Sequence, residues 1–444
     1  MKTIYALIAL SGLGATSSAA GPKGFDRIVI DADFPGAYQV EVADVNGDKR
    51  PDVVAVGGGT CAWYENPTWK KRIVTGPKQT PGIISSATAD LDGDGKAEIA
   101  IAYEFEMNDP KKGKLLLAVQ GKGPDDPWGV TTVTERENLA TPVGNTIGGA
   151  LGDARASVAR AVSPPRPLGN LGSIHRLRWG WIIGGPVVRP GSVSFVKKLE
   201  LVVAPIFGPS ATPPAFDQEP ARLTILDTGS DPKSGRWAAR VIGGAPVTHA
   251  IDVIDHGAGG PLGILEASNR GVTYYRLAAI GGAPLFMPRV LTPGAPGNAP
   301  KKGVSEVHAG KLRDGRRFLT TVEPWHGTEV AVYLSDSVHP LSLAPRIGPR
   351  DVIDTTLKEG HALWVADVDG DGDDEIFAGY RGPGTSVLMY DYNGKTWDRT
   401  VIDRDIAAQD LRGGDLDGDG TPDVVAVGGK THNVVWYRPV RKPG

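Results

Sequence analysis

The chain has 444 residues, a formal net charge of -3, 60 Gly, 36 Pro and a single cysteine, Cys61. The near-neutral charge gives no basis for a nucleic-acid partner, and no apolar run is long enough for a membrane span. An intrachain disulfide is excluded. The many Gly and Pro residues suit short strands joined by tight turns, and one large β-domain can absorb this length.

Residues 1 to 20 have the composition of a secretory signal peptide. Lys2 supplies the charged region, residues 4 to 13 form an apolar core, and Ser18, Ala19 and Ala20 provide small residues at a cleavage site. We therefore expect a secreted, extracellular protein. Residues 21 to 444 are expected to form a single domain.

Four copies of an acidic loop, each between two apolar strands, recur along the chain. Carboxylates at alternate positions of a Gly-containing turn converge on one point, where a hard cation such as calcium makes the cluster tolerable. The strands on either side distinguish these loops from an EF-hand. We predict calcium in the three complete copies and weaker binding in the first, where Lys49 stands in place of Gly; the alternative is four rigid turns without metal. The candidate ligands are Asp44, Asn46, Asp48 and Asp52; Asp90, Asp92, Asp94 and Glu98; Asp367, Asp369, Asp371 and Glu375; and Asp415, Asp417, Asp419 and Asp423.

The spacing of these loops predicts the fold. Asp44 and Asp90 are 46 residues apart, and Asp367 and Asp415 are 48 apart. A period of about 45 residues built from short strands is typical of propeller blades. Three degenerate blades fit the same frame around His175, His249 and His308. The sequence therefore predicts an all-β, seven-bladed propeller.

The N-terminal strand is expected to close this ring. Residues 25 to 31 match the last strand of a blade, as at residues 397 to 403, whereas the final blade at residues 434 to 437 lacks such a strand. The N-terminal strand would complete the last blade, which removes an exposed sheet edge.

Two irregular stretches, at about residues 135 to 173 and 181 to 196, do not fit the repeat. Either they are surface insertions or they are retained intron sequence. The second stretch breaks a blade that then resumes in register at Leu199, which favours the intron.

A ring of polar residues emerges when the blades are aligned on the residue six positions before the first loop Asp. The innermost strand of a propeller blade lines the central channel, so these residues should meet at one channel mouth, opposite the acidic loops. Loops that carry Arg381 and His326 should return to the same face. The alternative is a channel lined by histidines that only hold water. The aligned positions are Tyr38, Ile84, His175, His249, His308, His361 and Gln409.

Imidazole and guanidinium groups together suit an anionic sugar. Arg381 is expected to bind the substrate carboxylate, which acidifies the adjacent C–H group. A neutral His or Tyr side chain would remove that proton, and a second group would protonate the departing oxygen. This reaction is a β-elimination. His249, His308 and His361 are expected to form the core of the site, with Tyr38 or His326 as the proton donor. Three histidines could also hold a divalent transition metal.

Four phrases resemble a known family. Residues 174 to 179 (IHRLRW), 202 to 208 (VVAPIFG), 323 to 327 (EPWHG) and 359 to 364 (EGHALW) are similar to the propeller domain of fungal aldos-2-ulose dehydratase and to related secreted fungal lyases that cleave rhamnose from glucuronate. The acidic loops resemble FG-GAP or VCBS repeats. The resemblance implies a seven-bladed propeller with a carbohydrate substrate at the channel mouth. The matching site positions are His175, His249, His308, His326 and His361.

The resemblance leaves three functions open. The dehydratases carry cupin domains after the propeller, and this sequence shows none, which favours a lyase acting on a uronate-containing glycan. A dehydratase-like enzyme is the second reading. The third is a non-catalytic, calcium-binding propeller that binds a protein or a glycan.

Overall fold

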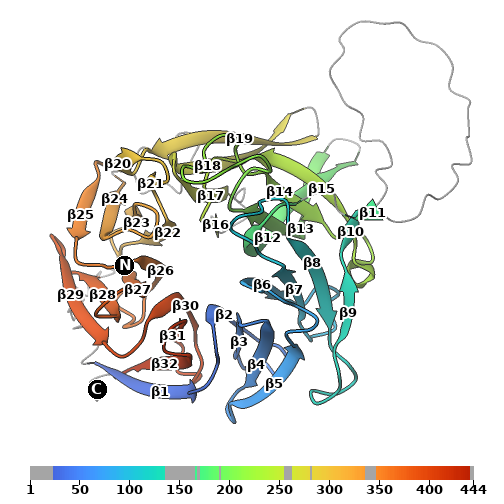
Figure 1. Cartoon of the computed structure of the whole chain (residues 1–444), viewed down its shortest axis with the longest axis horizontal. Helices are drawn as coiled ribbons and strands as arrows, with labels where there is room; N and C mark the ends of the chain where they lie inside the picture. The colour runs from blue at the N-terminus through green and yellow to red at the C-terminus, as the bar shows by residue number, and fades with distance from the viewer. Residues whose placement is uncertain are drawn as a thin grey trace, which may run out of the picture.

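The structure, a computed structural model, describes residues 24–135, 166–167, 171–189, 192–254, 263–280, 283–335 and 347–440. Within these residues, seven antiparallel sheets are arranged radially around a central axis, and each sheet is one blade (Figure 1). The predicted all-β, seven-bladed propeller is confirmed. No helix in the described ranges is long and apolar enough to cross a membrane. The expected signal peptide, residues 1 to 20, and most of residues 135 to 173 lie outside those ranges.

Each blade is a meander of four strands that runs from the channel outward. The first three blades comprise β2 (Ala37–Ala43), β3 (Asp52–Gly57), β4 (Thr60–Glu65) and β5 (Lys70–Thr75); β6 (Ser85–Ala89), β7 (Glu98–Tyr103), β8 (Lys114–Val119) and β9 (Gly129–Thr132); and β12 (Ile174–Arg189), β13 (Ser192–Pro205), β14 (Leu223–Asp227) and β15 (Arg236–Gly243), with β10 (Thr134–Glu135) and β11 (Arg166–Pro167) added at the edge of the third.

The remaining four blades follow the same plan. They comprise β16 (Ala250–Ile254), β17 (Gly263–Ser268), β18 (Gly271–Ile280) and β19 (Ala283–Thr292); β22 (Glu306–Lys311), β23 (Arg317–Glu323), β24 (Glu329–Leu334) and β25 (Asp351–Asp354); β26 (Gly360–Ala366), β27 (Glu375–Tyr380), β28 (Ser386–Tyr392) and β29 (Trp397–Asp403); and β30 (Ala408–Gly414), β31 (Asp423–Gly428), β32 (Asn433–Pro439) and β1 (Phe25–Asp31). A hairpin of β20 (Ala295–Asn298) and β21 (Lys301–Gly303) lies between the fourth and fifth blades in the chain.

The burial of each strand follows its place in the blade. β3 and β31 share the sequence DVVAVG and are buried along their whole length, because neighbouring blades cover both faces of a middle strand. Val suits such a strand because its β-branched side chain packs well on a pleated surface. In the outermost strand β5, only the C-terminal end is buried against the core, and Lys70 and Lys71 at its N-terminal end are exposed.

β1 closes the ring as predicted. It pairs antiparallel with β32 over Phe25–Asp31 and is the outermost strand of the seventh blade among the described residues. Phe25 also packs edge-on against Phe377 of the sixth blade, with ring centroids 6.2 Å apart. Arg27 forms a 2.7 Å ion pair with Asp403 at the end of β29. The N-terminal strand therefore joins both the last blade and the one before it.

A tyrosine–aspartate contact recurs between successive blades. The Tyr437 hydroxyl donates to Asp403 at 2.6 Å, where the carboxylate lies at the end of the preceding blade's outer strand. Tyr390 donates to Asp354 at 2.7 Å in the equivalent place one blade earlier. Tyr64 repeats the contact with Asp31 of β1. These hydrogen bonds to charged acceptors bind each blade to its neighbour at the periphery.

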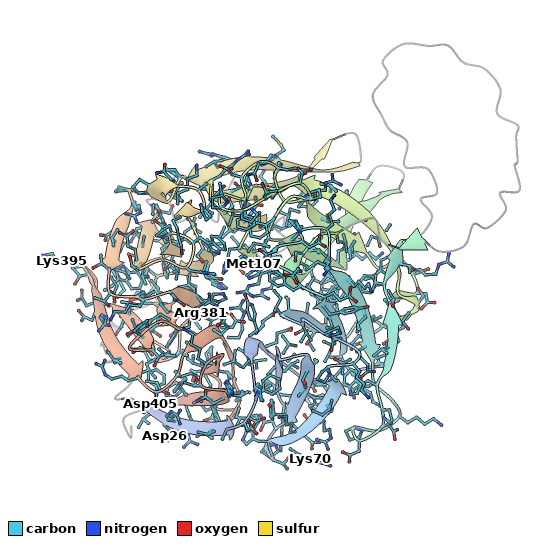
Figure 2. All side chains as sticks on the ribbon, in the orientation of Figure 1. Asp26, Lys70, Met107, Arg381, Lys395 and Asp405 are labelled. Carbon is cyan, nitrogen blue, oxygen red and sulfur yellow. The ribbon has the colours of Figure 1, made fainter. Side chains whose placement is uncertain are left out.

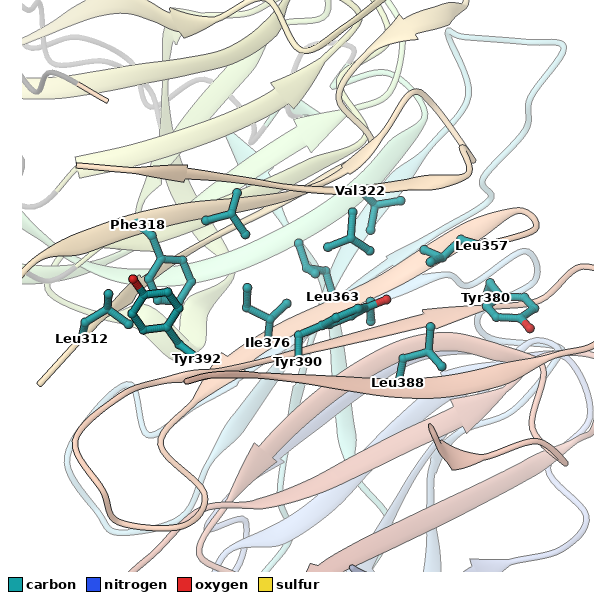
Figure 3. Packing of buried hydrophobic residues seen from close by; sticks show 13 residues of the cluster. Leu312, Phe318, Val322, Leu357, Leu363, Ile376, Tyr380, Leu388, Tyr390 and Tyr392 are labelled. Carbon is teal, nitrogen blue, oxygen red and sulfur yellow. The ribbon is translucent and has the colours of Figure 1, made fainter. Parts of the chain in front are cut away.

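The hydrophobic core is divided into clusters of buried side chains, here called packets, each between two neighbouring blades. The packet between the fifth and sixth blades joins Phe318 and Val322 of β23 to Leu363, Ile376 and Tyr390 of the next blade (Figure 3). All five side chains are almost fully buried. Because each packet draws on two blades, the hydrophobic effect holds neighbouring blades against each other.

The third blade differs from the expectation for residues 181 to 196. The sequence suggests an interruption there, whereas the structure continues β12 and β13 as one long hairpin, with Trp181 paired to Leu199 and Arg189 paired to Ser192. The extra residues therefore lengthen the two inner strands and leave the pairing that precedes them in place.

Candidate functional site

The histidine ring is built by a repeated irregularity at the start of the innermost strands. The pairing of β2, β12, β26 and β30 with their neighbours shifts by one residue at Tyr38, His175, His361 and Gln409. A bulge at this point re-aims the side chain of the extra residue. His249 occupies the equivalent place just before β16, where its N–H donates to the Ala267 carbonyl at 2.9 Å.

Each ring histidine is oriented by the next blade. Nδ1 of His175 donates to the His249 carbonyl at 2.6 Å, and Nδ1 of His361 donates to the Gln409 carbonyl at 2.7 Å. Nδ1 of His249 donates to the Ser305 carbonyl at 3.1 Å. A carbonyl can only accept, so the proton of each neutral imidazole is on Nδ1. Its Nε2 therefore carries the lone pair and can accept a hydrogen bond or bind a metal.

His308 does not belong to this ring, and its predicted position is wrong. Ser305 occupies the equivalent place, because its N–H donates to the Val322 carbonyl and its own carbonyl receives His249. In this blade Asp314 follows Ser305 by nine positions, whereas the expected interval is six. Counting six positions back from Asp314 gives His308, three residues after the true ring position. His308 lies further along β22 and contacts Asp252 at 3.4 Å.

The remaining imidazoles converge. One ring nitrogen each from His175, His249 and His361 lies within 4.8 Å of the other two. The Tyr38 hydroxyl donates to Nε2 of His175 at 2.9 Å and lies 3.4 Å from Nε2 of His361. Buried nitrogen donors with second-sphere hydrogen bonds suit a divalent transition metal, so these three residues fit the metal that the sequence analysis proposes.

His326 joins the ring from the loop after β23, as predicted. Its Nδ1 accepts from Nη2 of Arg381 at 3.2 Å, which places its proton on Nε2. That proton is directed at Nε2 of His249, 3.1 Å away. Arg381, His326 and His249 therefore form one hydrogen-bonded chain from the channel mouth to the ring. Arg381 lies beside the middle of the propeller (Figure 2).

The three ring imidazoles are neutral at ordinary pH. His175, His249 and His361 are at most 1 % exposed, and burial holds the pKa of each well below its usual range. The guanidinium groups of Arg176 and Arg381 act on His249 in the same direction. Burial also lowers the pKa of His326. Neutral imidazoles can accept protons or bind a metal, which charged ones cannot.

A buried charged layer that sequence reasoning missed lies under the ring. Nη2 of Arg176 donates to Oε1 of Glu306 at 3.2 Å, and the same oxygen lies 2.9 Å from Nδ1 of His249. Arg176 is fully buried, and its Nε and Nη1 have no hydrogen-bond partner among the described residues. Burial raises the pKa of Tyr38, and the positive charge of Arg176 opposes this shift. The only sequence signal was the motif IHRLRW, which contains Arg176.

The channel mouth is cationic. Nζ of Lys301 donates to the Trp325 carbonyl at 3.0 Å, and burial lowers the pKa of that amine. Nζ of Lys430 donates to the Arg381 carbonyl at 3.2 Å. Glu359 is the acidic partner of Arg381, at 3.4 Å. Arg381, Lys301 and Lys430 supply positive charge beside Glu359 in this part of the opening, which can attract an anionic ligand.

Aromatic side chains cover part of the ring. Phe105 packs against His175 with centroids 5.9 Å apart, and Trp325 packs against His326 at 4.9 Å. Phe207 joins Trp325 in the same apolar cluster. This cover leaves Tyr38, His326 and Arg381 as the partly exposed members of the site, whereas the other three histidines are fully buried. A substrate at the mouth would meet these three first.

The acidic loops lie where the repeat predicts, and their first Asp organises each turn. Asp367 accepts the backbone N–H groups of Gly370 and Gly372, and Asp44 accepts those of Gly47 and Lys49. Lys49 must then adopt a φ of 70°, which costs more for Lys than for Gly. In the described residues, carboxylate oxygens gather within 4.8 Å in three of the four loops, formed by Asp90, Asp92 and Asp94; by Asp367, Asp369 and Asp371; and by Asp415, Asp417 and Asp423.

The Asp367 loop fits a cation well. Oδ2 of Asp369 and Oε1 of Glu375 are buried without a hydrogen-bond partner among the described residues. Burial raises the pKa of Glu375 to about 10 and that of Asp369 to about 6. In the Asp415 loop, Asp423 takes the place expected for Asp419 in the oxygen cluster. The first loop supplies the amide oxygen of Asn46 in place of one carboxylate, and weaker binding is expected there.

Calcium removal is expected to lower the melting temperature. A ligand that binds only the folded state stabilises it by roughly 2.7 kcal/mol when its concentration is 100 times its dissociation constant. Calorimetry with and without a chelator would measure this, and elemental analysis would identify the metal. An unchanged melting temperature together with no bound calcium would contradict the prediction. Glu375→Gln is the matched variant, because it replaces a carboxylate oxygen that could bind the ion with an amide nitrogen and keeps the size of the side chain.

Comparisons with known proteins identify the repeat. A model of the FG-GAP-like repeat matches residues 32–101 and 367–438. Among curated proteins, none matches the chain. One similar solved structure is an Agrocybe aegerita lectin described as recognising non-reducing terminal N-acetylglucosamine (14 % identity, 92 % of this chain and 87 % of that chain covered, TM-score 0.45). Another is AofleA from Arthrobotrys oligospora (9 %, 87 % and 93 %, TM-score 0.40). The first and last parts of this seven-bladed propeller are thus FG-GAP-like repeats.

Proposed function

We propose that the protein is a secreted lyase that cleaves a uronate-containing glycan, such as one capped by rhamnose on glucuronate, by β-elimination at the histidine face. The observation that carries the proposal is the chain from Arg381 through His326 to His249, next to Tyr38. It combines a guanidinium that can hold a carboxylate with neutral groups that can transfer a proton. The sequence resemblance to fungal lyases supports the same chemistry.

Binding of the carboxylate frees the base. Arg381 now donates to Nδ1 of His326; when the guanidinium turns to the substrate carboxylate, that lone pair becomes available. His326 then accepts the proton from the carbon next to the carboxylate. The electron pair of the C–H bond forms the C=C bond, and the C–O bond at the β carbon breaks. Lys301 and Lys430 reduce the cost of the negative charge that develops on the carboxylate.

Tyr38 is the proton donor in this scheme. Its hydroxyl is held by Nε2 of His175 and lies near Nε2 of His361, so it is directed toward the middle of the ring. It protonates the departing oxygen, and the positive charge of Arg176 stabilises the phenolate that remains. A divalent metal held by His175, His249 and His361 would, when bound, add electrophilic stabilisation of the carboxylate.

The reaction is tested by ultraviolet absorbance during incubation with uronate-containing glycans. Elimination next to a carboxylate produces a conjugated double bond, and we expect absorbance to rise with a new non-reducing end in the product. Arg381→Lys keeps the charge but loses the planar fork that binds a carboxylate in bidentate fashion, so we expect it to cut activity at least 10-fold. Wild-type protein that binds such glycans without any rise in absorbance would contradict the lyase.

A non-catalytic glycan-binding propeller is the second candidate, and one pocket favours it. A pocket of about 730 Å³ lies between the first and seventh blades and is lined by Trp69, Trp436, Arg50 and Asp417. Its volume is within the usual range for ligand sites, and the indole of the partly exposed Trp69 can stack on a sugar ring. Glycan binding without turnover that is lost in Trp69→Ala, but kept in Arg381→Lys, would support this candidate over the lyase.

A further inference from the structure

The Asp90 loop already contains a cation from the chain itself. Nζ of Lys233 lies 2.8 Å from Asp92, 2.9 Å from Asp94 and 3.1 Å from Glu98. Lys233 belongs to the turn Pro232–Ser234 (η1), before the outermost strand of the third blade. The ammonium therefore contacts three of the four carboxylates that the sequence analysis assigns to calcium in this loop.

Electrostatics agree with this geometry. The Asp92, Asp94 and Glu98 carboxylates raise the pKa of Lys233 against the effect of burial, and the hydrogen bond from Lys233 lowers the pKa of Asp94. An ammonium has three N–H donors, and each of its three contacts here is at hydrogen-bond length. Calcium needs six to eight oxygen ligands at about 2.3–2.6 Å, and the Lys233 side chain obstructs that arrangement.

The other two oxygen clusters differ. In the Asp367 loop, Arg313 contacts Asp371 at 2.5 Å and also Asp373, but within the described residues it leaves Asp369 Oδ2 and Glu375 without a cation. For Asp415, Asp417 and Asp423, the described part of the chain contains no ion pair with Lys or Arg at salt-bridge distance. The Asp90 loop thus has a tethered ammonium that contacts three of its carboxylates, whereas Arg313 contacts one carboxylate of the Asp367 cluster, Asp371.

We infer that Lys233 replaces calcium in the Asp90 loop and fastens the second blade to the third without metal. Asp94 belongs to the second blade and Lys233 to the third, 139 residues later in the sequence. The contact therefore links the two blades directly, in addition to the chain segment that connects them. The second and third blades would stay joined when calcium is removed. The Asp367 and Asp415 loops would instead lose a bound ion.

Calcium stoichiometry tests the inference. Equilibrium dialysis of the full chain with calcium alone is expected to give about two ions per chain, in the Asp367 and Asp415 loops. Lys233→Met removes the ammonium and keeps the length of the side chain, and it should add about one calcium site. Wild-type protein that binds three ions, with no gain in Lys233→Met, would overturn the inference.

Two further variants give a result even if Lys233→Met fails to fold. Asp92→Asn removes a partner of Lys233, so it should lower the melting temperature by a similar amount with calcium and with chelator. Asp417→Asn, in a loop that still accepts calcium, should lower it only when calcium is present. The inference fails if the effect of Asp92→Asn disappears in chelator, because the loop would then act through calcium.

Discussion

Replacing His326 with alanine is expected to reduce turnover on a uronate-containing glycan roughly 100-fold or more. His326 is the ring imidazole that combines partial exposure with a direct hydrogen bond to Arg381. Its loss removes the proposed base and breaks the chain to His249. The fold should survive, because the side chain lies at the channel mouth and the inter-blade packets lie elsewhere. Initial rates by absorbance and melting curves by circular dichroism would measure both effects.

His308→Ala is the matched control for this experiment. His308 was expected in the ring from the sequence, but it lies further along β22 against Asp252, so its removal should leave turnover close to the wild-type value. His249→Ala and His361→Ala should reduce turnover too, with some loss of stability because both side chains are fully buried. If His326→Ala, His249→Ala and His361→Ala all fold and keep full activity, the ring only lines a channel.

Deleting residues 21 to 31 is expected to make the protein aggregate. The deletion removes β1, leaves the outer edge of β32 unpaired from Val434 to Pro439, and exposes the apolar surface that Phe25 covers. An exposed edge strand pairs readily with other chains. Size-exclusion chromatography with light scattering would detect oligomers, and calorimetry would show a lower melting temperature.

Arg27→Ala separates strand pairing from the ion pair that accompanies it. The variant loses the ion pair with Asp403, in which the arginine side chain is partly exposed. It keeps β1 and its pairing with β32. We expect a change of at most about 1 kcal/mol in the free energy of unfolding. A monomeric deletion protein with unchanged thermal stability would show that β1 is dispensable for closure.

Part of the site could be predicted because its signals are local. The six-residue interval from the ring position to the first loop Asp places His361 correctly, since its blade keeps the repeat length of strand and turn. His175 also lies in the ring, although Trp181 stands six positions after it and β12 continues to Arg189. Where the loop loses its pattern, the interval fails. In the fifth blade, Asp314 lies three residues later than the frame requires, so His308 was aligned in place of Ser305.

The charged layer and the mouth were not predictable from spacing. Arg176 and Glu306 come from the third and fifth blades and meet only because the ring brings these blades around one axis. Lys301 lies in a hairpin between blades that has no counterpart in the repeat. No periodicity connects such residues, because their proximity depends on loop lengths and on the reach of each side chain.

The sequence by itself determined the blade count, the closing strand and the acidic turns, because each of these depends on a short pattern that recurs along the chain. Strand alternation and turn chemistry act over a few residues, so they can be recognised without knowing the fold. The tertiary structure alone decided which histidines converge and which cation enters the Asp90 loop. Lys233 meets Asp94 across 139 residues, and only the packing of one blade against the next brings that ammonium to those carboxylates.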